Sequence, residues 1–318
     1  RGRLEPTPAR FANEAALKAT AVNVARGVGR LLDEANPRLD ARLPDGSRVH
    51  AVIPPLARCG TVIAIRKFRK ETLSIERMLG FGSLDEGVVA LLRAAVRLRR
   101  NIIVSGGTSS GKTSVLNALS SFIPPEERVL VLEDASELQL QQAHVVCFET
   151  RRPDKHGQGE VTIRDLIHSA LRLRPDRLVV GEIRGGEALD LLQALNTGHA
   201  GSMSTIHANS PLDCLYRLET CALLSGVGLP LFALRSQVAS AVDVVAHTAR
   251  LADGSRKMVA VSEVLPLASG EYAVRDLVRW RTEAVAEDGR LLGAFERLAE
   301  PTFAEEAARM GVPLEGAR

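Results

Sequence analysis

The stretch Gly106-Gly107-Thr108-Ser109-Ser110-Gly111-Lys112-Thr113 decides the fold of this chain, because it has the spacing GxxxxGK[ST] of a phosphate-binding loop, or P-loop. An apolar run at 102–104 precedes it, and residues 114–120 begin a predicted helix. A strand, loop and helix in this order point backbone N–H groups and the positive end of a helix dipole at phosphate. The alternative, a glycine-rich turn with an exposed lysine, does not account for the two flanking elements.

Each residue type in this loop suits one part of a nucleoside triphosphate. Small residues let the backbone curl so that its N–H groups point at the β-phosphate. Lys112 supplies a full charge to the β- and γ-phosphates, and Thr113 offers a hydroxyl to Mg²⁺. The sequence therefore predicts ATP and Mg²⁺ as ligands, held by Gly106, Gly107, Thr108, Ser109, Ser110, Gly111, Lys112, Thr113 and Ser114.

Strands and helices alternate on both sides of the P-loop. Strands are predicted at short apolar runs, residues 102–104, 129–132, 145–148, 178–180 and 202–206. Two helices between them begin at capping residues, Thr162 and Ser210. This alternation predicts an α/β fold with a mostly parallel sheet covered on both faces. Asp253-Gly254 predicts a hairpin, and residues from about 290 read as a polar helical tail.

The first third of the chain has a pattern of its own. An amphipathic helix is predicted within 11–32, and strands are predicted at 49–53 and 61–68. Gly80-Phe81-Gly82-Ser83 has the composition of a linker, and 318 residues are long for one domain. We therefore predict an N-terminal domain at 1–80, a linker at 81–86 and a second domain at 87–318.

Acidic residues follow two of the predicted strands. Residues 129–132 lead into Glu133-Asp134, and residues 178–180 lead into Gly181-Glu182. Because the carboxyl ends of parallel strands meet at the ligand crevice, these acids are expected beside the phosphates. We predict that Glu182 and Glu133 act on the attacking water and that Glu182 and Asp134 contact Mg²⁺. For Asp134, an ordinary helix-capping role explains the pattern equally well.

Basic and imidazole side chains complete the predicted catalytic set. His199 and His207 flank the strand at 202–206, and we predict that they contact the γ-phosphate or the water, since no third ligand for zinc is placed near them. Arg184, close behind Glu182, is a candidate nucleotide sensor or interface residue. Arg66 and Arg69 end a predicted strand, where spacing alone favours a solvated basic edge over a phosphate contact.

Composition limits the functional classes. Apolar residues make up 45% and charged residues 25%, which excludes disordered, collagen-like and small disulfide-rich chains. The net charge of +3 does not by itself indicate a nucleic-acid partner. The four cysteines form no CxxC pair, so we expect reduced thiols. With no apolar run of ~18 residues and no signal-peptide pattern, we expect a cytoplasmic chain, and whether native sequence precedes Arg1 stays open.

Several blocks of sequence in a fixed order resemble the secretion ATPase superfamily, which powers type II and type IV secretion and type IV pili. The branch that looks closest is the CpaF/TadA type of the tight-adherence (Flp) pili. The blocks are 40–49 running into Pro54-Pro55, 65–68, the P-loop, the acidic "Asp box" at 133–138, the Walker B region at 174–188 with Glu182, and the "His box" at 197–211. The resemblance covers roughly residues 28–265.

This resemblance implies a RecA-like P-loop NTPase motor domain preceded by a smaller α/β N-terminal domain. It implies a homo-hexameric ring that hydrolyses ATP at the inner face of the cytoplasmic membrane, where inner-membrane platform proteins of a pilus or secretion machine are its partners. In such rings Arg66 and Arg69 match the arginine segment that reaches nucleotide. Glu133 and Glu182 match acids that share water activation and Mg²⁺ placement, and which of them is the base stays open.

Two departures from the family pattern and two alternative functions accompany this interpretation. Ser109 stands where the branch usually has glycine, and we expect it to be tolerated if its φ is negative. Ala200 stands where an acid is common. A conjugation-type or type IV secretion ATPase is the alternative within the superfamily. A RecA-like nucleic-acid translocase would need stacking aromatics, which are few here, and no direct nucleic-acid contact is predicted.

Overall fold

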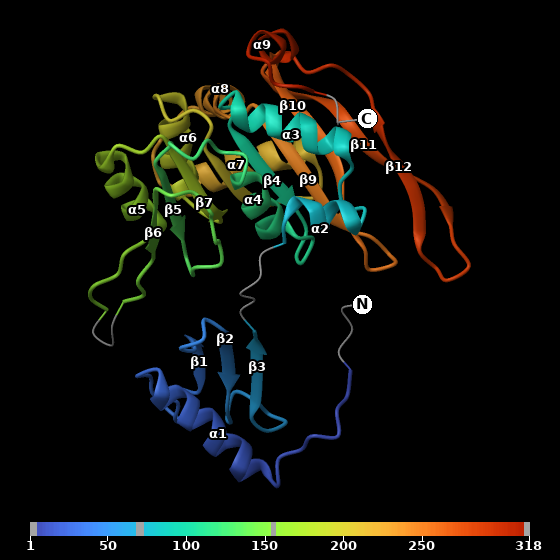
Figure 1. Ribbon diagram of the computed structural model, residues 1–318. Coiled ribbons are helices and arrows are strands. Elements are labelled where there is room, and N and C mark those ends of the chain that lie inside the picture. Colours follow the sequence, from blue (N-terminus) through green and yellow to red (C-terminus); the bar gives the residue numbers. More distant parts are fainter. Residues whose placement is uncertain (1–4, 68–72, 154–156, 315–318) are drawn as a thin grey trace. The chain divides into compact units, whose positions relative to one another are not determined.

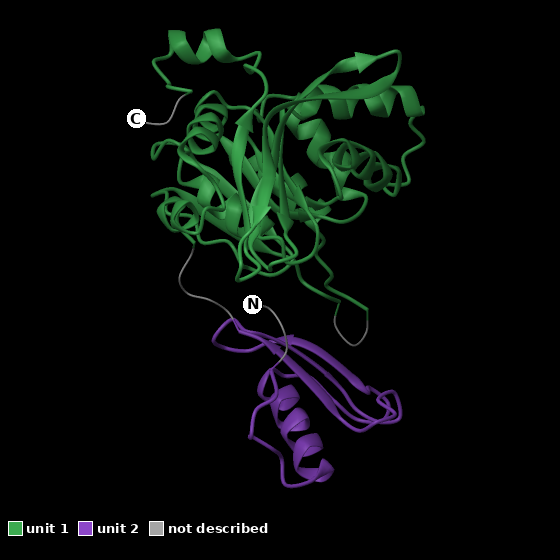
Figure 2. Ribbon diagram, turned by 90° about the vertical axis from the view of Figure 1, so that its right-hand side faces the viewer, with its two compact units in different colours: residues 1, 72–318 green, residues 2–71 purple. Residues whose placement is uncertain are grey.

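The computed structural model describes residues 5–67, 73–153 and 157–314, and the chain divides into two compact units, residues 2–71 and 72–318 (Figure 2). The predicted linker at 81–86 therefore lies inside the larger unit. There the Lys257 ammonium donates to the Gly82 carbonyl at 2.5 Å, and the Met258 N–H donates to the Ser83 carbonyl at 3.0 Å. The boundary falls earlier than expected because Ile75 already packs in the larger core.

The smaller unit is a helix packed on an antiparallel sheet. It consists of α1 (Glu14–Gly27), β1 (Arg38–Arg42), β2 (Arg48–Val52) and β3 (Val62–Arg66), with the three strands in the order β1-β2-β3. Asn13 caps α1 by accepting a hydrogen bond from the Ala16 N–H at 2.9 Å. Ala21 and Ala25 on α1 are fully buried in the core with Ala51 of β2, and such small side chains allow a close approach. The predicted helix and two strands are present, and β1 was not predicted.

The larger unit contains the P-loop domain (Figure 1). Its helices are α2 (Ile75–Gly80), α3 (Glu86–Arg97), α4 (Lys112–Ser120), α5 (Ile163–Ala170), α6 (Glu187–Asn196), α7 (Pro211–Leu223), α8 (Leu231–Ala241) and α9 (Ala304–Arg309). Its strands are β4 (Ile102–Gly106), β5 (Val129–Glu133), β6 (Val145–Glu149), β7 (Arg177–Ile183), β8 (Met203–His207), β9 (Val244–Arg250), β10 (Arg256–Ala268), β11 (Glu271–Val285) and β12 (Leu291–Arg297).

These strands form one nine-stranded sheet in the order β12-β11-β10-β9-β4-β8-β7-β5-β6. The pairs from β9 to β6 are parallel, and the pairs from β9 to β12 are antiparallel. Ile102 and Val104 on β4 lie in one buried core, and Ile103 lies in the other. Both faces of β4 are therefore covered, which confirms the predicted α/β fold with a mostly parallel sheet.

The C-terminal part of the sheet differs from the expectation in one respect. The hairpin at Asp253-Gly254 is confirmed, because it joins the antiparallel strands β9 and β10. The predicted helical tail is wrong for residues 291–297, which form β12 against the long strand β11. Phe295 packs edge to face on Trp280 there, with ring centroids 5.0 Å apart, so strand pairing and aromatic contact override the polar composition.

None of the described helices is both long enough and apolar enough to cross a membrane.

Candidate active site

The P-loop joins the carboxyl end of β4 to the amino end of α4, as the sequence predicts. Gly106 and Gly111 have φ values of +151° and +104°, which explains glycine at both positions. Ser109 also has a positive φ, +60°, so the condition under which we expected it to be tolerated without strain is not met. A non-glycine residue in this region costs roughly 1–2 kcal/mol. The loop therefore holds a strained residue in the middle of its sequence signature.

Lys112 lies at the centre of the site and is only 7% exposed. Its ammonium donates to the carbonyl oxygens of Gly106 at 3.1 Å and Gly107 at 3.0 Å. Burial lowers the pKa of Lys112, and the nearby Glu182 carboxylate opposes that shift. The lysine side chain is thus folded over the mouth of the loop, where a phosphate oxygen could exchange with these two carbonyls as its partner.

A chain of polar contacts runs from Lys112 to two acids. The Lys112 ammonium lies 3.3 Å from His207 Nδ1, and His207 Nε2 lies 2.9 Å from Glu182 Oε1. Arg184 Nε donates to the other oxygen of Glu182 at 2.7 Å, and its Nη1 donates to Asp134 at 3.2 Å. These residues meet because β5, β7, β8 and β4 end at the same edge of the sheet. The structure therefore brings together five predicted site residues from four segments of the chain.

The imidazole of His207 sits between a cation and a carboxylate. Burial and the Lys112 charge lower the pKa of His207, and Glu182 partly opposes them. The ring is therefore neutral near pH 7, so only one of its nitrogens carries a proton. A neutral ring can bridge Lys112 and Glu182 only by accepting from the ammonium through Nδ1 and donating to the carboxylate through Nε2.

Glu133 ends β5 and is 3% exposed. Its Oε1 accepts hydrogen bonds from the N–H groups of Glu137 at 2.9 Å and Leu138 at 3.0 Å. Burial raises the pKa of Glu133 to about 7, although those two N–H groups act in the opposite direction. Its side chain packs against the backbone of the neighbouring strand, where a Cβ at Gly181 would lie 3.0 Å from Glu133 Cγ. Glu133 thus lies against Gly181, the residue before Glu182, and it binds the loop at 134–138.

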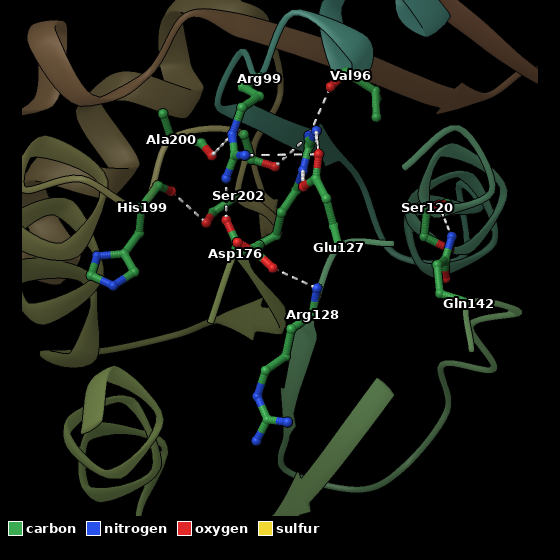
Figure 3. A network of polar contacts seen from close by, with 12 residues as sticks. Val96, Arg99, Ser120, Glu127, Arg128, Gln142, Asp176, His199, Ala200 and Ser202 are labelled. Carbon is green, nitrogen blue, oxygen red and sulfur yellow. Dashed lines mark hydrogen bonds and ion pairs between the residues drawn. The ribbon is translucent and has the colours of Figure 1, made fainter. Parts of the chain in front are cut away.

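His199 does not join this cluster. It precedes β8 whereas His207 ends it, and the five residues of β8 span about 13 Å. His199 Nδ1 lies 3.3 Å from the Ala194 carbonyl, and the His199 carbonyl accepts from the Ser202 hydroxyl at 2.7 Å. Figure 3 shows His199 with Ser202 in the polar network at the amino ends of the strands. Spacing in the sequence placed both histidines at strand ends without distinguishing the two ends of the strand.

Of the two candidate arginines near the end of β3, the structure describes Arg66 but not Arg69. Arg66 is the last residue of β3, where it is exposed and lies opposite Arg48 of β2. Arg69 lies outside the described residues. The remaining predicted nucleotide-binding residues lie in the P-loop and, for Thr113 and Ser114, in the first turn of α4.

Sequence reasoning missed several buried polar residues, one at the amino edge of the sheet and two beside the P-loop. Arg177 begins β7, has no exposed surface, and donates from Nε to Glu127 at 2.5 Å and from Nη1 to the Val96 carbonyl at 2.7 Å. His247 and Thr248 are buried on β9 beside the P-loop. The available signal was a polar or charged residue inside an apolar strand, which is informative because such a residue needs a buried partner.

The sequence of the chain matches a known protein family and several of its members. Residues 4–284 match the family described as type II/IV secretion system protein. The chain belongs to this family. Among relatives, a Mycobacterium tuberculosis protein named for conjugal transfer is 40% identical over 285 residues, 88% of this chain and 80% of the relative. The type IV secretion system protein PtlH of Bordetella pertussis is 36% identical over 274 residues, 76% of this chain and 79% of the relative.

Solved structures of a secretion-system ATPase and of a pilus motor have a similar fold. The VirB11 ATPase from the Brucella suis type IV secretion system, in complex with sulphate, is 31% identical with a TM-score of 0.50, covering 78% of this chain and 80% of that one. The pilus retraction motor PilT with bound ADP is 20% identical with a TM-score of 0.55, covering 95% of this chain and 75% of that one. The predicted fold class, a smaller α/β domain before a P-loop domain, is confirmed.

Proposed function

We propose that this chain binds and hydrolyses ATP and that it is a motor of a type II/IV secretion machine. The observation that carries the proposal is the contact chain Lys112–His207–Glu182 at the mouth of a P-loop. Lys112 supplies a cation for the phosphates and Glu182 supplies a carboxylate for the attacking water, two groups that phosphoryl transfer to water uses, and the neutral His207 ring joins them. Membership of the secretion family supplies the context in which such a site does mechanical work.

In this mechanism the backbone N–H groups of the P-loop cradle the β-phosphate. Lys112 leaves the carbonyls of Gly106 and Gly107 and binds the β- and γ-phosphates. Glu182 orients the attacking water and accepts its proton, while His207 holds the carboxylate in place through its 2.9 Å contact. Glu133 has a pKa about 7, which suits a base. However, it is buried and committed to the loop at 134–138, so the geometry favours Glu182.

The oxygen groups near the P-loop fit Mg²⁺. The ion prefers hard oxygen ligands and is usually held by one or two carboxylates together with phosphate oxygens. Glu182 and Asp134 supply carboxylates that one arginine, Arg184, already bridges, and Thr113 supplies a hydroxyl in the first turn of α4. When bound there, Mg²⁺ would neutralise phosphate charge. Arg184 lies on the same two carboxylates and is a second positive charge beside the phosphate site.

The finer features of the proposed motor concern assembly and partners. We propose a homo-hexamer in which Arg66 and Arg69 contribute to a nucleotide site, at the cytoplasmic face of the membrane, with inner-membrane platform proteins as partners. A pilus-assembly machine of the tight-adherence (Flp) type is one candidate destination, on the sequence blocks described above. A conjugation or type IV secretion machine is the second candidate, and relatives named for conjugal transfer and type IV secretion favour it.

Two substitutions test the proposed activity. Lys112→Ala should abolish ATP turnover and weaken ADP binding in calorimetry. Glu182→Gln should keep ADP binding and lower kcat by a factor of about 10² or more, because the amide keeps the size and loses the base. Glu296→Gln on β12, which breaks an exposed 3.6 Å ion pair with Arg281 of β11, is the control. Near-normal turnover by Lys112→Ala would overturn the assignment of the active site.

A further inference from the structure

Strand β9 places two buried polar side chains beside the P-loop, and neither belongs to a recognised sequence motif. Thr248 is 2% exposed and His247 is 6% exposed. β9 pairs in parallel with β4, so that Thr248 lies opposite Gly106 and His247 lies opposite Ser105. A polar side chain buried on an apolar strand needs a hydrogen-bond partner. The partners of both residues lie on β4 and in loops of the candidate active site.

Thr248 forms a hydrogen bond with the side chain of Ser110. Thr248 Oγ1 lies 2.8 Å from Ser110 Oγ and donates to the Ser105 carbonyl at 3.2 Å. A threonine hydroxyl has one proton, so Ser110 must be the donor in the shorter contact. Ser110 is itself 3% exposed. Its hydroxyl is therefore directed into the protein, and it ties the P-loop to β9 and is not available to phosphate.

The β9–β10 hairpin approaches the P-loop at two further points, once through its backbone and once through a side chain. A Cβ at Gly106 would lie 2.2 Å from the Thr248 carbonyl oxygen, so the first glycine of the motif is required by the approach of β9. Arg256, at the start of β10, donates from Nε to the Ser109 carbonyl at 2.8 Å. That bond holds the peptide that follows the residue with φ +60°. The hairpin thus contacts the loop at Gly106, Ser109 and Ser110.

His247 makes the corresponding connection to the loop that follows His207. His247 Nδ1 lies 2.8 Å from the Ser105 hydroxyl, and the ring also forms a hydrogen bond with the backbone of Asn209. The Asn209 N–H donates to the Asp213 carboxylate at 2.7 Å. Asn209 follows His207 by one intervening residue. This short connection is therefore held on both sides, by β9 and by the first turn of α7.

We propose that β9 is a positioning strand for the ATP site. Thr248 holds the P-loop in its phosphate-binding shape through Ser110, and His247 holds the loop that follows His207, which keeps His207 against Glu182. Neither side chain touches nucleotide or water in this scheme, and both act through the residues they position. The inference rests on the proposed function for its kinetic consequences, and its structural part can be measured without nucleotide.

The test compares Thr248→Val, Thr248→Ser and Ser262→Ala. Valine keeps the shape of threonine and leaves the buried Ser110 hydroxyl without its acceptor, whereas serine keeps the bond. Ser262→Ala removes a buried hydroxyl that donates to Asp276 at 2.5 Å on β10 and β11, and it is the matched control for lost stability. Hydrogen exchange of the P-loop amides in the nucleotide-free protein should be about tenfold faster in Thr248→Val only. The Kd for ADP should rise about tenfold in the same variant and recover in Thr248→Ser.

The outcomes separate this inference from the proposed function. The positioning role of Thr248 would be overturned if hydrogen exchange of the P-loop amides were unchanged in Thr248→Val. It would also be overturned if that exchange were accelerated equally in Ser262→Ala. Wild-type protein that fails to bind ADP would overturn the proposed function, and the exchange result would still decide the role of Thr248. If Thr248→Val does not fold, Ser110→Ala removes the same bond without leaving a donor unpaired, and it should give the same exchange result. His247→Phe should lower kcat about tenfold with little change in the Kd for ADP, and an unchanged kcat would remove His247 from the scheme.

Discussion

Replacing Glu133 by glutamine should change the pH dependence of stability of the larger unit. Glu133 is almost completely buried, and its pKa is raised to about 7 from an ordinary value of 4.5. The folded protein therefore keeps this proton to a higher pH than the unfolded chain does. Between these two pKa values the folded state binds more protons, so the free energy of unfolding falls as pH rises. Glutamine cannot ionise, and its oxygen can still accept from the N–H groups of Glu137 and Leu138.

The size of the effect follows from that shift. One pKa unit corresponds to about 1.4 kcal/mol. The raised pKa of Glu133 therefore lowers the free energy of unfolding of the wild type by about 2.5 kcal/mol between pH 5 and pH 8. The loss begins near pH 4.5 and is complete above pH 7. The pKa of buried Asp243 is also raised, but this group is common to both proteins and cancels in their difference. The free energy of unfolding of Glu133→Gln, relative to that of the wild type, should therefore rise by about 2.5 kcal/mol between pH 5 and pH 8.

Urea unfolding followed by tryptophan fluorescence measures this difference. Trp280 is the only tryptophan and lies on β11, so it reports on the unit that contains Glu133. Unfolding free energies would be determined at pH 5, 6, 7 and 8 for the wild type, Glu133→Gln and the exposed control Glu296→Gln. The control should follow the wild type at every pH. A stability difference that stays constant from pH 5 to pH 8 would refute the argument that burial dominates at Glu133.

Three further substitutions test local features of the site. Ser109→Gly should raise the free energy of unfolding by up to about 1 kcal/mol in urea titrations, because glycine relieves the left-handed φ; a destabilised variant would contradict the strain. Gly106→Ala should destabilise the protein by about 2 kcal/mol and abolish ADP binding in calorimetry, because the new Cβ meets the Thr248 carbonyl. Arg66→Lys should keep ADP binding and lower kcat, because lysine lacks the planar fork of arginine; full turnover would return Arg66 to a solvated basic edge.

The local part of the site could be predicted from sequence because its determinants are close together in the chain. The P-loop is defined by small residues, a lysine and a threonine at fixed spacing, and its flanking strand and helix follow from apolar periodicity. Glu182 was placed correctly beside it because an acid directly after an apolar strand lies at the carboxyl edge of a parallel sheet. The residue types at these positions predict the chemistry without reference to long-range contacts.

Other features depended on which segments become neighbours in space. Residues 291–297 have the polar composition of a surface helix, yet pairing with β11 makes them a strand. His199 and His207 look equivalent along the sequence, but the direction of β8 sends them to opposite edges of the sheet. The unit boundary moved to 71/72 because Ile75 is buried in the larger core.

The sequence alone thus determined the P-loop and the alternation of strands and helices. It also placed Glu133, Glu182 and His207 at strand ends. Each of these features is encoded by spacing within a few residues. Only the tertiary structure decided that Glu133 is buried enough to titrate near neutrality and that Thr248 of β9 bonds to Ser110 across 138 residues. The physical reason is that burial and hydrogen-bond partners arise from long-range packing. Sheet order brings β9 beside β4, and no spacing along the chain specifies that neighbour.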